Sequence, residues 1–387
     1  MADQGTELSQ RLRWGHPIDR PSFARLDRRT SAGRAFRQLA WRPAHLTTRP
    51  RALLYTCRNM KPRMLVPLFA LAATTYAAEP TTTLVNVGDG VKVEVVDWGG
   101  SGRPLILLAG SGNSAHVYED FALKLLDTCH VYGITRRGYG LSSKPERGYS
   151  VPELAEDVWR VIQSLHIAKP VVVGHSMAGS ELSFLGQKHS PDLAALIYLD
   201  GNADPMDYPW SNVEYRTLTA KHAADAPAAP PTRTAADNAS VEAYQAYQKR
   251  IGVFPFPAGE IRSVYAVNPD GSVGKYRTPA FVSPAIDNGS IRKDYTGITV
   301  PVLALLAVPR PMVEQWKEKP PRDEEDRRDS ERLNQIEMEF IHRWESNLTH
   351  ADPLAQIVEL PGAHHYMFQN EEADVLREMK TFLRGLN

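Results

Sequence analysis

A serine stands where a buried strand would pass into a helix. The run Val171–Gly174 is apolar and β-branched up to its glycine, and Ser176 follows it ahead of a helical pattern. A sharp strand-to-helix turn exposes a serine hydroxyl as a nucleophile, and it needs small residues two positions before and two positions after the serine. Gly174 and Ala178 meet this need, although glycine is usual where Ala178 stands. We therefore predict nucleophilic catalysis at Ser176, with helix N-capping as its structural alternative.

A serine hydroxyl becomes a strong nucleophile only when a base removes its proton. Two histidines, His364 and His365, follow the last apolar strand pattern, which ends at Leu360. We predict that His365 is the base and interpret His364 as a surface side chain. A metal-binding pair is the alternative, but no further histidine or carboxylate lies at the spacing of a zinc motif. The sequence therefore predicts no metal.

The third catalytic group should be a carboxylate that orients the histidine, placed between serine and histidine in chain order. After the apolar run 300–308 the chain has no acid until Glu314. The preceding strand pattern ends at Asp200, so it puts a carboxylate at the carboxyl end of a strand, where ligands meet a parallel sheet. We predict Asp200 as the acid. Asp204 and Glu314 are alternatives, and a structural role for Asp200 in capping the next turn also stays open.

Acyl transfer needs N–H groups directed at the developing oxyanion. With this type of serine turn they come from the residue after the serine and from the loop after an earlier strand. The first would be Met177, and the loop 109–115 would supply Ser111, with Gly112 as a further candidate.

The loop 109–115 also fits a different class of protein, because it matches the pattern Gly-x-Gly-x-x-Ala from Gly110 onward. Arg136 and Arg137, near the end of the next strand pattern, would suit NADP, so an NADP-dependent oxidoreductase is the rival interpretation. That fingerprint belongs on the first strand of its unit, whereas a hairpin precedes this one. It also leaves the serine and histidine motifs unexplained.

Strand and helix patterns alternate along most of the chain after residue 80. A hairpin is predicted at 83–97, and helical patterns at 117–126, 150–165 and 375–386 separate apolar runs at 105–109, 131–135, 171–173, 194–199, 300–308 and 356–360. This alternation predicts an α/β fold with a mostly parallel, doubly covered sheet. The charged run 317–332 is interpreted as a solvated helix face.

Residues 201–299 break the alternation with several proline-rich turns. We predict a cap inserted between strands 6 and 7 of the sheet, with the core at 79–200 and 300–387. Aromatic residues of the cap would suit an apolar acyl or aryl pocket, although the interior of a lid would use the same ones: Tyr208, Trp210, Tyr244, Tyr247, Phe254 and Phe256.

The formal net charge is zero, but residues 1–63 hold 14 Lys and Arg against 4 Asp and Glu, while residues 64–387 hold 31 against 41. The basic head lacks apolar periodicity, which disfavours a nucleic-acid partner. Residues 60–78 have the charged, apolar and small-residue order of a signal peptide, and the apolar part is shorter than the ~20 residues of a membrane span. We expect a periplasmic or secreted protein whose residues 1–59 are a misassigned or disordered leader.

Only two cysteines are present, Cys57 and Cys129. Cys57 would be lost with the leader, so no disulfide can form within the mature chain. We interpret Cys129 as a buried apolar residue.

Together these motifs resemble the α/β-hydrolase superfamily, specifically its exported bacterial members, from about residue 83 to the end. The resemblance implies hydrolysis of a small-molecule ester through an acyl-enzyme on Ser176, His365 at the position of the base, and no metal or organic cofactor. Serine stands where epoxide and haloalkane hydrolases have aspartate, which favours esters, lactones or amides. A non-catalytic hydrolase-like binding protein is the remaining alternative. The matching segments are Leu108-Ala-Gly-Ser-Gly-Asn113, Ile134-Thr-Arg-Arg-Gly-Tyr-Gly140, Gly174-His-Ser176, Tyr198-Leu-Asp200 and Pro361-Gly-Ala-His-His365.

Overall fold

The computed structural model describes residues 79–222 and 231–386. The predicted leader at 1–59 and signal peptide at 60–78 lie outside these residues. Within the described ranges, no helix has both the length and the apolar character needed to cross a bilayer.

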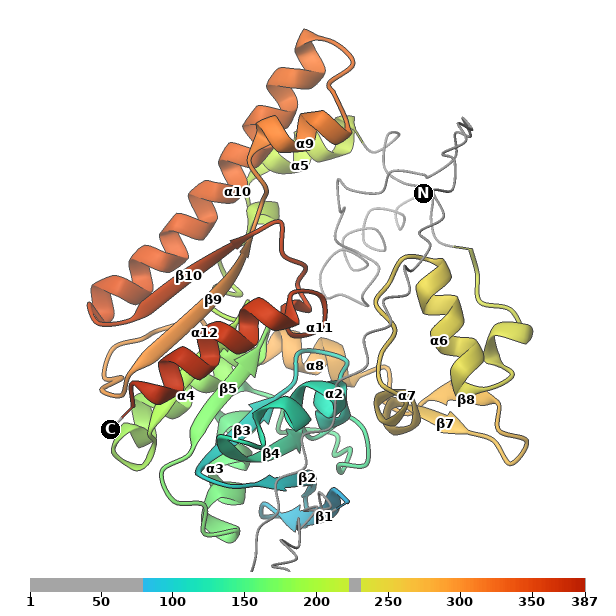
Figure 1. The fold of residues 1–387 in the computed structure, drawn as a ribbon, viewed down its shortest axis with the longest axis vertical. Helices are drawn as coiled ribbons and strands as arrows, with labels where there is room; N and C mark the ends of the chain where they lie inside the picture. Colours follow the sequence, from blue (N-terminus) through green and yellow to red (C-terminus); the bar gives the residue numbers. More distant parts are fainter. Residues whose placement is uncertain (1–78, 223–230, 387) are drawn as a thin grey trace, which may run out of the picture. The chain divides into compact units, whose positions relative to one another are not determined.

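An eight-stranded sheet forms the centre of the fold, in the order β1-β2-β4-β3-β5-β6-β9-β10 (Figure 1). The first two strands form an antiparallel hairpin, β2 runs antiparallel to β4, and all later pairs are parallel. The mostly parallel sheet predicted from the alternating patterns is therefore confirmed. The strands are β1 (Thr81–Asn86), β2 (Lys92–Gly100), β3 (Arg103–Leu108), β4 (Cys129–Thr135), β5 (Val171–His175), β6 (Ala195–Leu199), β9 (Val302–Val308) and β10 (Gln356–Pro361).

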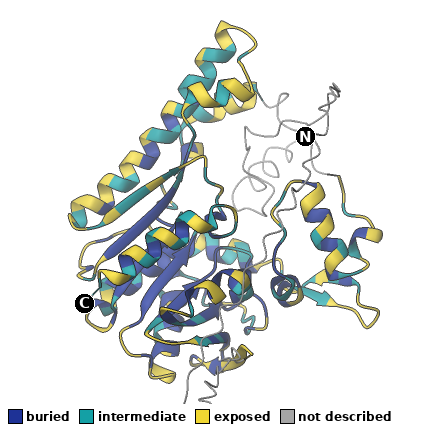
Figure 2. Ribbon diagram, viewed as in Figure 1, coloured by how far each residue is buried: buried dark blue, intermediate teal, exposed yellow. Residues whose placement is uncertain are grey.

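Helices cover both faces of the sheet, and each face has its own apolar cluster. One cluster joins the strands to α12 (Glu372–Arg384) and to the short helices between Ala115 and Leu125. The other joins them to α3 (Val151–Ser164), α4 (Ala178–His189) and the end of α10 (Glu324–Ala351). The central strands are buried on both sides (Figure 2), which is why they consist almost entirely of aliphatic residues.

The region predicted as a single helix at 117–126 is broken into three short pieces: a 3₁₀ helix at Ala115–Tyr118, α2 at Glu119–Ala122 and a second 3₁₀ helix at Leu123–Leu125. The apolar spacing is nevertheless that of the prediction, because Val117, Phe121 and Leu125 all face the core. Tyr118 donates a hydrogen bond from its hydroxyl to the carbonyl of Leu108, 3.0 Å away, which ties this segment to the end of β3.

An insertion of residues 201–299, here called the cap, separates β6 from β9, the sixth and seventh strands of the sheet, as predicted. A two-stranded hairpin turns at Asn268-Pro-Asp-Gly271, one of the turn signals in the sequence. The cap contains α5 (Val213–Lys221), α6 (Val241–Arg250), α7 (Ala258–Val264), β7 (Tyr265–Val267), β8 (Val273–Tyr276) and α8 (Val282–Asn288).

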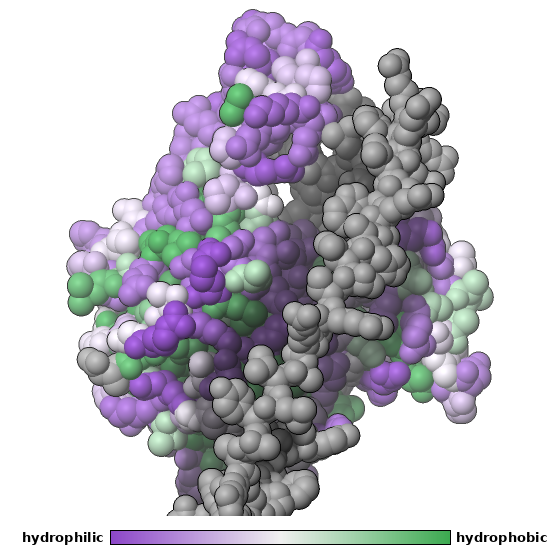
Figure 3. All heavy atoms as spheres, viewed as in Figure 1, coloured by the Kyte–Doolittle hydropathy of each residue, from purple (hydrophilic) through white to green (hydrophobic). Residues whose placement is uncertain are grey.

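The charged run 317–332 spans the end of α9 (Met312–Glu318) and the beginning of α10. Figure 3 shows the surface at this end of α10 as largely hydrophilic, as expected of a solvated helix face. The run also has a partner that the sequence pattern did not indicate, because α5 of the cap pairs with it. Lys221 lies 2.5 Å from Asp329, and Arg332 lies 2.7 Å from Glu214.

Candidate active site

Ser176 occupies the turn between β5 and α4 with φ of +56°, a left-handed conformation that is costly for a residue with a side chain. The turn is tight because small residues meet in it. A Cβ on Gly174 would lie 3.0 Å from the carbonyl carbon of Ala178, and a Cβ on Gly179 would lie 1.7 Å from the carbonyl oxygen of Gly201. The first contact explains the glycine at position 174, because the atom it would meet belongs to the backbone of residue 178. The second contact shows that position 179 also requires glycine, which was not predicted from the sequence.

Asp200 follows β6 and meets His365, which follows β10. The carboxylate oxygen Oδ2 of Asp200 lies 2.5 Å from Nδ1 of His365. The other carboxylate oxygen accepts a hydrogen bond from the backbone N–H of Ala307, at 3.2 Å. A carboxylate can only accept, so Nδ1 carries the proton and Nε2 of His365 is left as the basic nitrogen. This is the tautomer that a general base needs.

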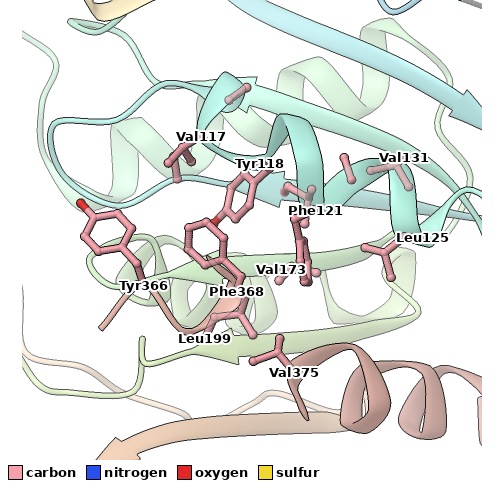
Figure 4. Packing of buried hydrophobic residues seen from close by; sticks show 14 of the residues in the cluster. Val117, Tyr118, Phe121, Leu125, Val131, Val173, Leu199, Tyr366, Phe368 and Val375 are labelled. Carbon is pink, nitrogen blue, oxygen red and sulfur yellow. The ribbon is translucent and has the colours of Figure 1, made fainter. Parts of the chain in front are cut away.

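His175, the residue before Ser176, links the serine turn to the histidine loop. Its Nε2 donates to the backbone carbonyl of His365 at 2.9 Å, and the two imidazole rings lie 4.5 Å apart. Beyond His365, Tyr366 and Phe368 are buried in the core, with Phe368 4.6 Å from the Tyr118 ring (Figure 4). The backbone at His365 and the residues that follow it are thus held against the core.

The predicted oxyanion loop, residues 110–115, lies directly against the serine turn. A Cβ on Gly110 would be 3.1 Å from Cβ of Ser176 and 2.9 Å from Nδ1 of His175, so only glycine fits there. Ser111 and Gly112 follow Gly110 in this loop, and Met177 lies between Ser176 and the start of α4. Their roles as oxyanion donors stay predictions.

Arg136 supports the oxyanion loop from within the core. Its guanidinium donates to the carbonyl oxygen of Ala109 at 2.9 Å and to Glu181 of α4 at 2.5 Å. Arg137 is likewise buried, and it pairs with Asp157 at 2.5 Å and 2.6 Å. Both guanidiniums are therefore held by buried carboxylates, so the dinucleotide interpretation loses the cations that suggested it.

The two alternative acids have surroundings that differ from those of Asp200. Asp204 is buried and pairs with Arg292 at 3.2 Å, and Glu314 is exposed on α9.

Lys293 lies near the proposed acid and was not predicted from the sequence. Its ammonium group donates to the carbonyl oxygen of Gly201, next to Asp200. Burial lowers the pKa of Lys293 to about 7, against the opposing pull of the Asp204 and Asp200 carboxylates.

A small hollow opens beside Ser176 between the core and the cap. None of its lining side chains carries a formal charge, which suits a neutral group of a substrate. The lining residues are Val151, Ser176, Met177, Ser180, Ala203, Pro205, Tyr208 and Ser290. Of the cap aromatics singled out in the sequence, Tyr208 is the one on this hollow.

One group of side chains in the described residues could share a metal ion. His342 and Glu345 of α10 and Glu359 of β10 hold donor atoms within 4.8 Å of one another. Burial and the neighbouring carboxylate of Glu359 raise the pKa of Glu345 to about 7. None of these residues belongs to the serine site.

Comparison with known proteins places the chain in a family. The model of the alpha/beta hydrolase family matches residues 105–378. The chain belongs to this family, which confirms the resemblance to the α/β-hydrolase superfamily.

The curated relatives match only in part. The chain is 32% identical over 98 residues to 2-(acetamidomethylene)succinate hydrolase of Mesorhizobium japonicum, a match that covers 25% of this chain and 35% of that protein. The chain thus matches about a third of the length of that relative.

Solved structures share the fold over a longer range. The crystal structure of E-2-(acetamidomethylene)succinate hydrolase superposes with a TM-score of 0.57 at 19% identity, covering 79% of this chain and 100% of that one. The esterase RhEst1 from Rhodococcus gives a TM-score of 0.51 at 18% identity, covering 79% and 99%. At these identities the likeness shows the fold alone.

Proposed function

We propose that this hydrolase is a serine carboxylesterase that cleaves a small neutral ester through an acyl-enzyme on Ser176. The observation that carries the proposal is the 2.5 Å contact between Asp200 and Nδ1 of His365, at the same sheet edge as a serine held at φ of +56°. An acid that fixes the tautomer of a histidine, beside a serine in a strained turn, is the arrangement that activates a hydroxyl.

The proposed reaction has two halves. The hydroxyl oxygen of Ser176 attacks the ester carbonyl while Nε2 of His365 takes the proton, and the resulting oxyanion accepts hydrogen bonds from backbone N–H groups of Met177 and of Ser111 or Gly112. The imidazolium then gives its proton to the leaving alcohol. In the second half, His365 activates a water molecule, which releases the acid and restores the serine.

The lining of the hollow supports a neutral acyl group. The name of the matched relative contains succinate, a dicarboxylate. Recognition of a carboxylate usually requires Arg or Lys, whereas the hollow beside Ser176 is lined by uncharged residues, among them Ala203, Pro205 and Tyr208. We therefore propose an ester with a small uncharged acyl group.

A substrate panel tests this proposal. The full chain would be assayed on p-nitrophenyl esters of graded chain length, on the hemisuccinate ester, on lactones and on anilides. The proposal predicts the highest kcat/KM on short neutral esters. Preference for the hemisuccinate or for anilides would contradict it.

We also propose that the protein is exported, on the strength of the charged, apolar and small-residue order at 60–78. N-terminal sequencing of the protein recovered from the periplasm or medium should show a mature chain that begins directly after Ala77 or Ala78. A cytoplasmic protein that retains these residues would contradict export.

A further inference from the structure

A buried carboxylate of the cap contacts the oxyanion loop. Glu260, on α7, has an exposed fraction of 0%. Its Oε1 accepts from the Asn113 side-chain amide at 2.8 Å, and its two oxygens accept from the backbone N–H of Ser114 at 3.1 Å and 3.2 Å. The Ser114 hydroxyl adds a fourth hydrogen bond at 2.5 Å. All these donors belong to the two residues that follow Gly112.

The contact extends to the histidine loop. The side-chain oxygen of Asn113, whose amide group donates to Glu260, accepts a hydrogen bond from the Tyr366 hydroxyl at 2.8 Å. Tyr366 directly follows His365. A single chain of hydrogen bonds therefore runs from the cap, through the oxyanion loop, to the residue beside the proposed base.

The same part of the cap makes a further hydrogen bond to the oxyanion loop. Tyr276, on β8, donates from its hydroxyl to the carbonyl oxygen of Gly112 at 2.8 Å. Helix α7 leads directly into β7, the partner of β8, so both contacts come from one continuous unit of the cap. A third contact joins α7 to the neighbouring short helix, where the Gly259 N–H donates to Glu119 at 3.0 Å.

The contact between Glu260 and the loop does more than pack the cap against the core. A buried carboxylate is costly unless donors surround it, and apolar residues would join two surfaces at lower cost. Here the donors belong to the predicted oxyanion loop, and their hydrogen bonds to Glu260 form only while the cap is docked. Rates of acyl transfer depend steeply on the orientation of oxyanion donors.

We propose that Glu260 is a positioning residue, which fixes the oxyanion loop from the cap and so couples the seating of the cap to acyl transfer at Ser176. This inference rests on the proposed function for its effect on rate. Its structural part, that Glu260 orders residues 110–115, can be measured without any substrate.

Protonation should modulate the contact. Burial raises the pKa of Glu260 to about 7, in spite of the hydrogen bonds from Ser114 and Asn113. Because burial against the loop raises this pKa, the docked cap favours the protonated carboxyl, so docking weakens as Glu260 ionises with rising pH. The titratable groups that interact with Glu260 from the neighbouring elements are His116, Tyr118, Tyr276 and Tyr366. Glu119 contacts the adjacent Gly259. His116 is paired with Glu94 at 3.2 Å and favours the ionised form of Glu260.

The test compares Glu260→Gln with Glu242→Gln, a control at an exposed position on cap helix α6. Two quantities are measured: kcat and KM on a short ester, normalised to the folded fraction, and amide hydrogen exchange in peptides covering residues 109–118. We expect Glu260→Gln to lower kcat by about tenfold with little change in KM, less than the loss of an oxyanion donor itself. Exchange should rise in the 109–118 peptides, and Glu242→Gln should change neither quantity.

A purely structural role for Glu260 would lower stability but leave the normalised kcat and the local exchange unchanged, and this result would overturn the proposal. If Glu260→Gln does not fold, Tyr276→Phe tests the same loop through Gly112 and should shift both readouts in the same direction by a smaller factor. A wild type inactive on every ester would defeat the proposed function alone. Faster exchange at 109–118 in Glu260→Gln would still support the coupling.

Discussion

The sheet core and the cap bury their charged groups in different ways. The core neutralises its own, because Arg136 pairs with Glu181 and Arg137 pairs with Asp157, and all four side chains come from the core. The cap pairs buried Asp204 with its own Arg292, but it buries Glu260 against neutral donors of a core loop. The core charges are therefore satisfied whatever the cap does, whereas Glu260 is satisfied only when the cap is docked on that loop.

This difference predicts different effects for substitutions in the core and in the cap. The strand ends of the core set the backbone positions of Ser176, Asp200 and His365, so substitutions there should abolish the reaction on any substrate. The cap acts on the same site through side chains, so substitutions there should alter rate, pH response or substrate preference by smaller factors.

The largest effect is expected at the nucleophile and base. Ser176→Ala or His365→Ala should each lower kcat by about 10⁶-fold, and the double variant should be no worse than either single one, because the two groups act as a unit. Stopped and continuous ester assays with matched circular dichroism spectra measure this. Additive losses in the double variant would indicate that the two residues do not cooperate.

The acid should come next. Asp200→Asn leaves the shape of the side chain intact but favours the wrong imidazole tautomer, and we expect kcat to fall by about 10⁴-fold. Asp204→Asn is the matched control, because Asp204 pairs with Arg292. If kcat instead fell by about 10⁴-fold in Asp204→Asn while Asp200→Asn stayed near wild type, the role of the acid would move to Asp204.

The free energy of unfolding tests the charge pairs that lie wholly within the core. Arg136→Met leaves Glu181 buried without its cation, which should lower the free energy of unfolding by about 3–5 kcal/mol. Lys221→Met, in the exposed pairs between α5 and α10, should change it little. Equal losses in urea titrations of the two variants would remove the distinction between core and surface pairs.

The cap carboxylate should give stability a pH dependence. The folded-state pKa of Glu260 is about 7, against an ordinary value of 4.5. Between these values the folded protein binds a proton that the unfolded chain has released, so this group contributes a stability that is complete at low pH and is lost as the pH rises through about 7. Glu260→Gln should remove this slope from urea titrations repeated across the range. An unchanged slope would show that Glu260 does not titrate there.

The smallest effect is expected at the hollow. Tyr208 lines it and stacks on Trp210 with ring centroids 4.2 Å apart. Tyr208→Ala should shift the preference toward longer acyl chains, with changes in kcat/KM of about tenfold, as expected when a site gains room for a methylene group. The ester panel measures this shift. An unchanged chain-length profile would place the acyl group elsewhere.

The core could be predicted from the sequence because its physical requirements are local. Continuous aliphatic runs indicated buried parallel strands, and Gly174, Ser176 and Ala178 indicated a tight turn. Asp200 could be proposed because it directly follows such a run. Ser176, Asp200 and His365 follow the carboxyl ends of β5, β6 and β10, at one edge of the sheet.

The cap contacts could not be predicted because their partners are far apart along the chain. Glu260 lies 146 residues from Ser114, in a proline-rich segment without periodicity. The requirement at Gly179 likewise depends on Gly201, which approaches it only in the folded chain. Local patterns carry no information on such encounters.

The most direct test of the whole account is covalent labelling of the wild-type chain with a fluorophosphonate, followed by peptide mass spectrometry. We predict a single phosphonylated residue, Ser176, with labelling abolished in Ser176→Ala and strongly slowed in His365→Ala. A folded wild type that resists the probe, or label found on another residue, would contradict the claim that Ser176 is an activated nucleophile.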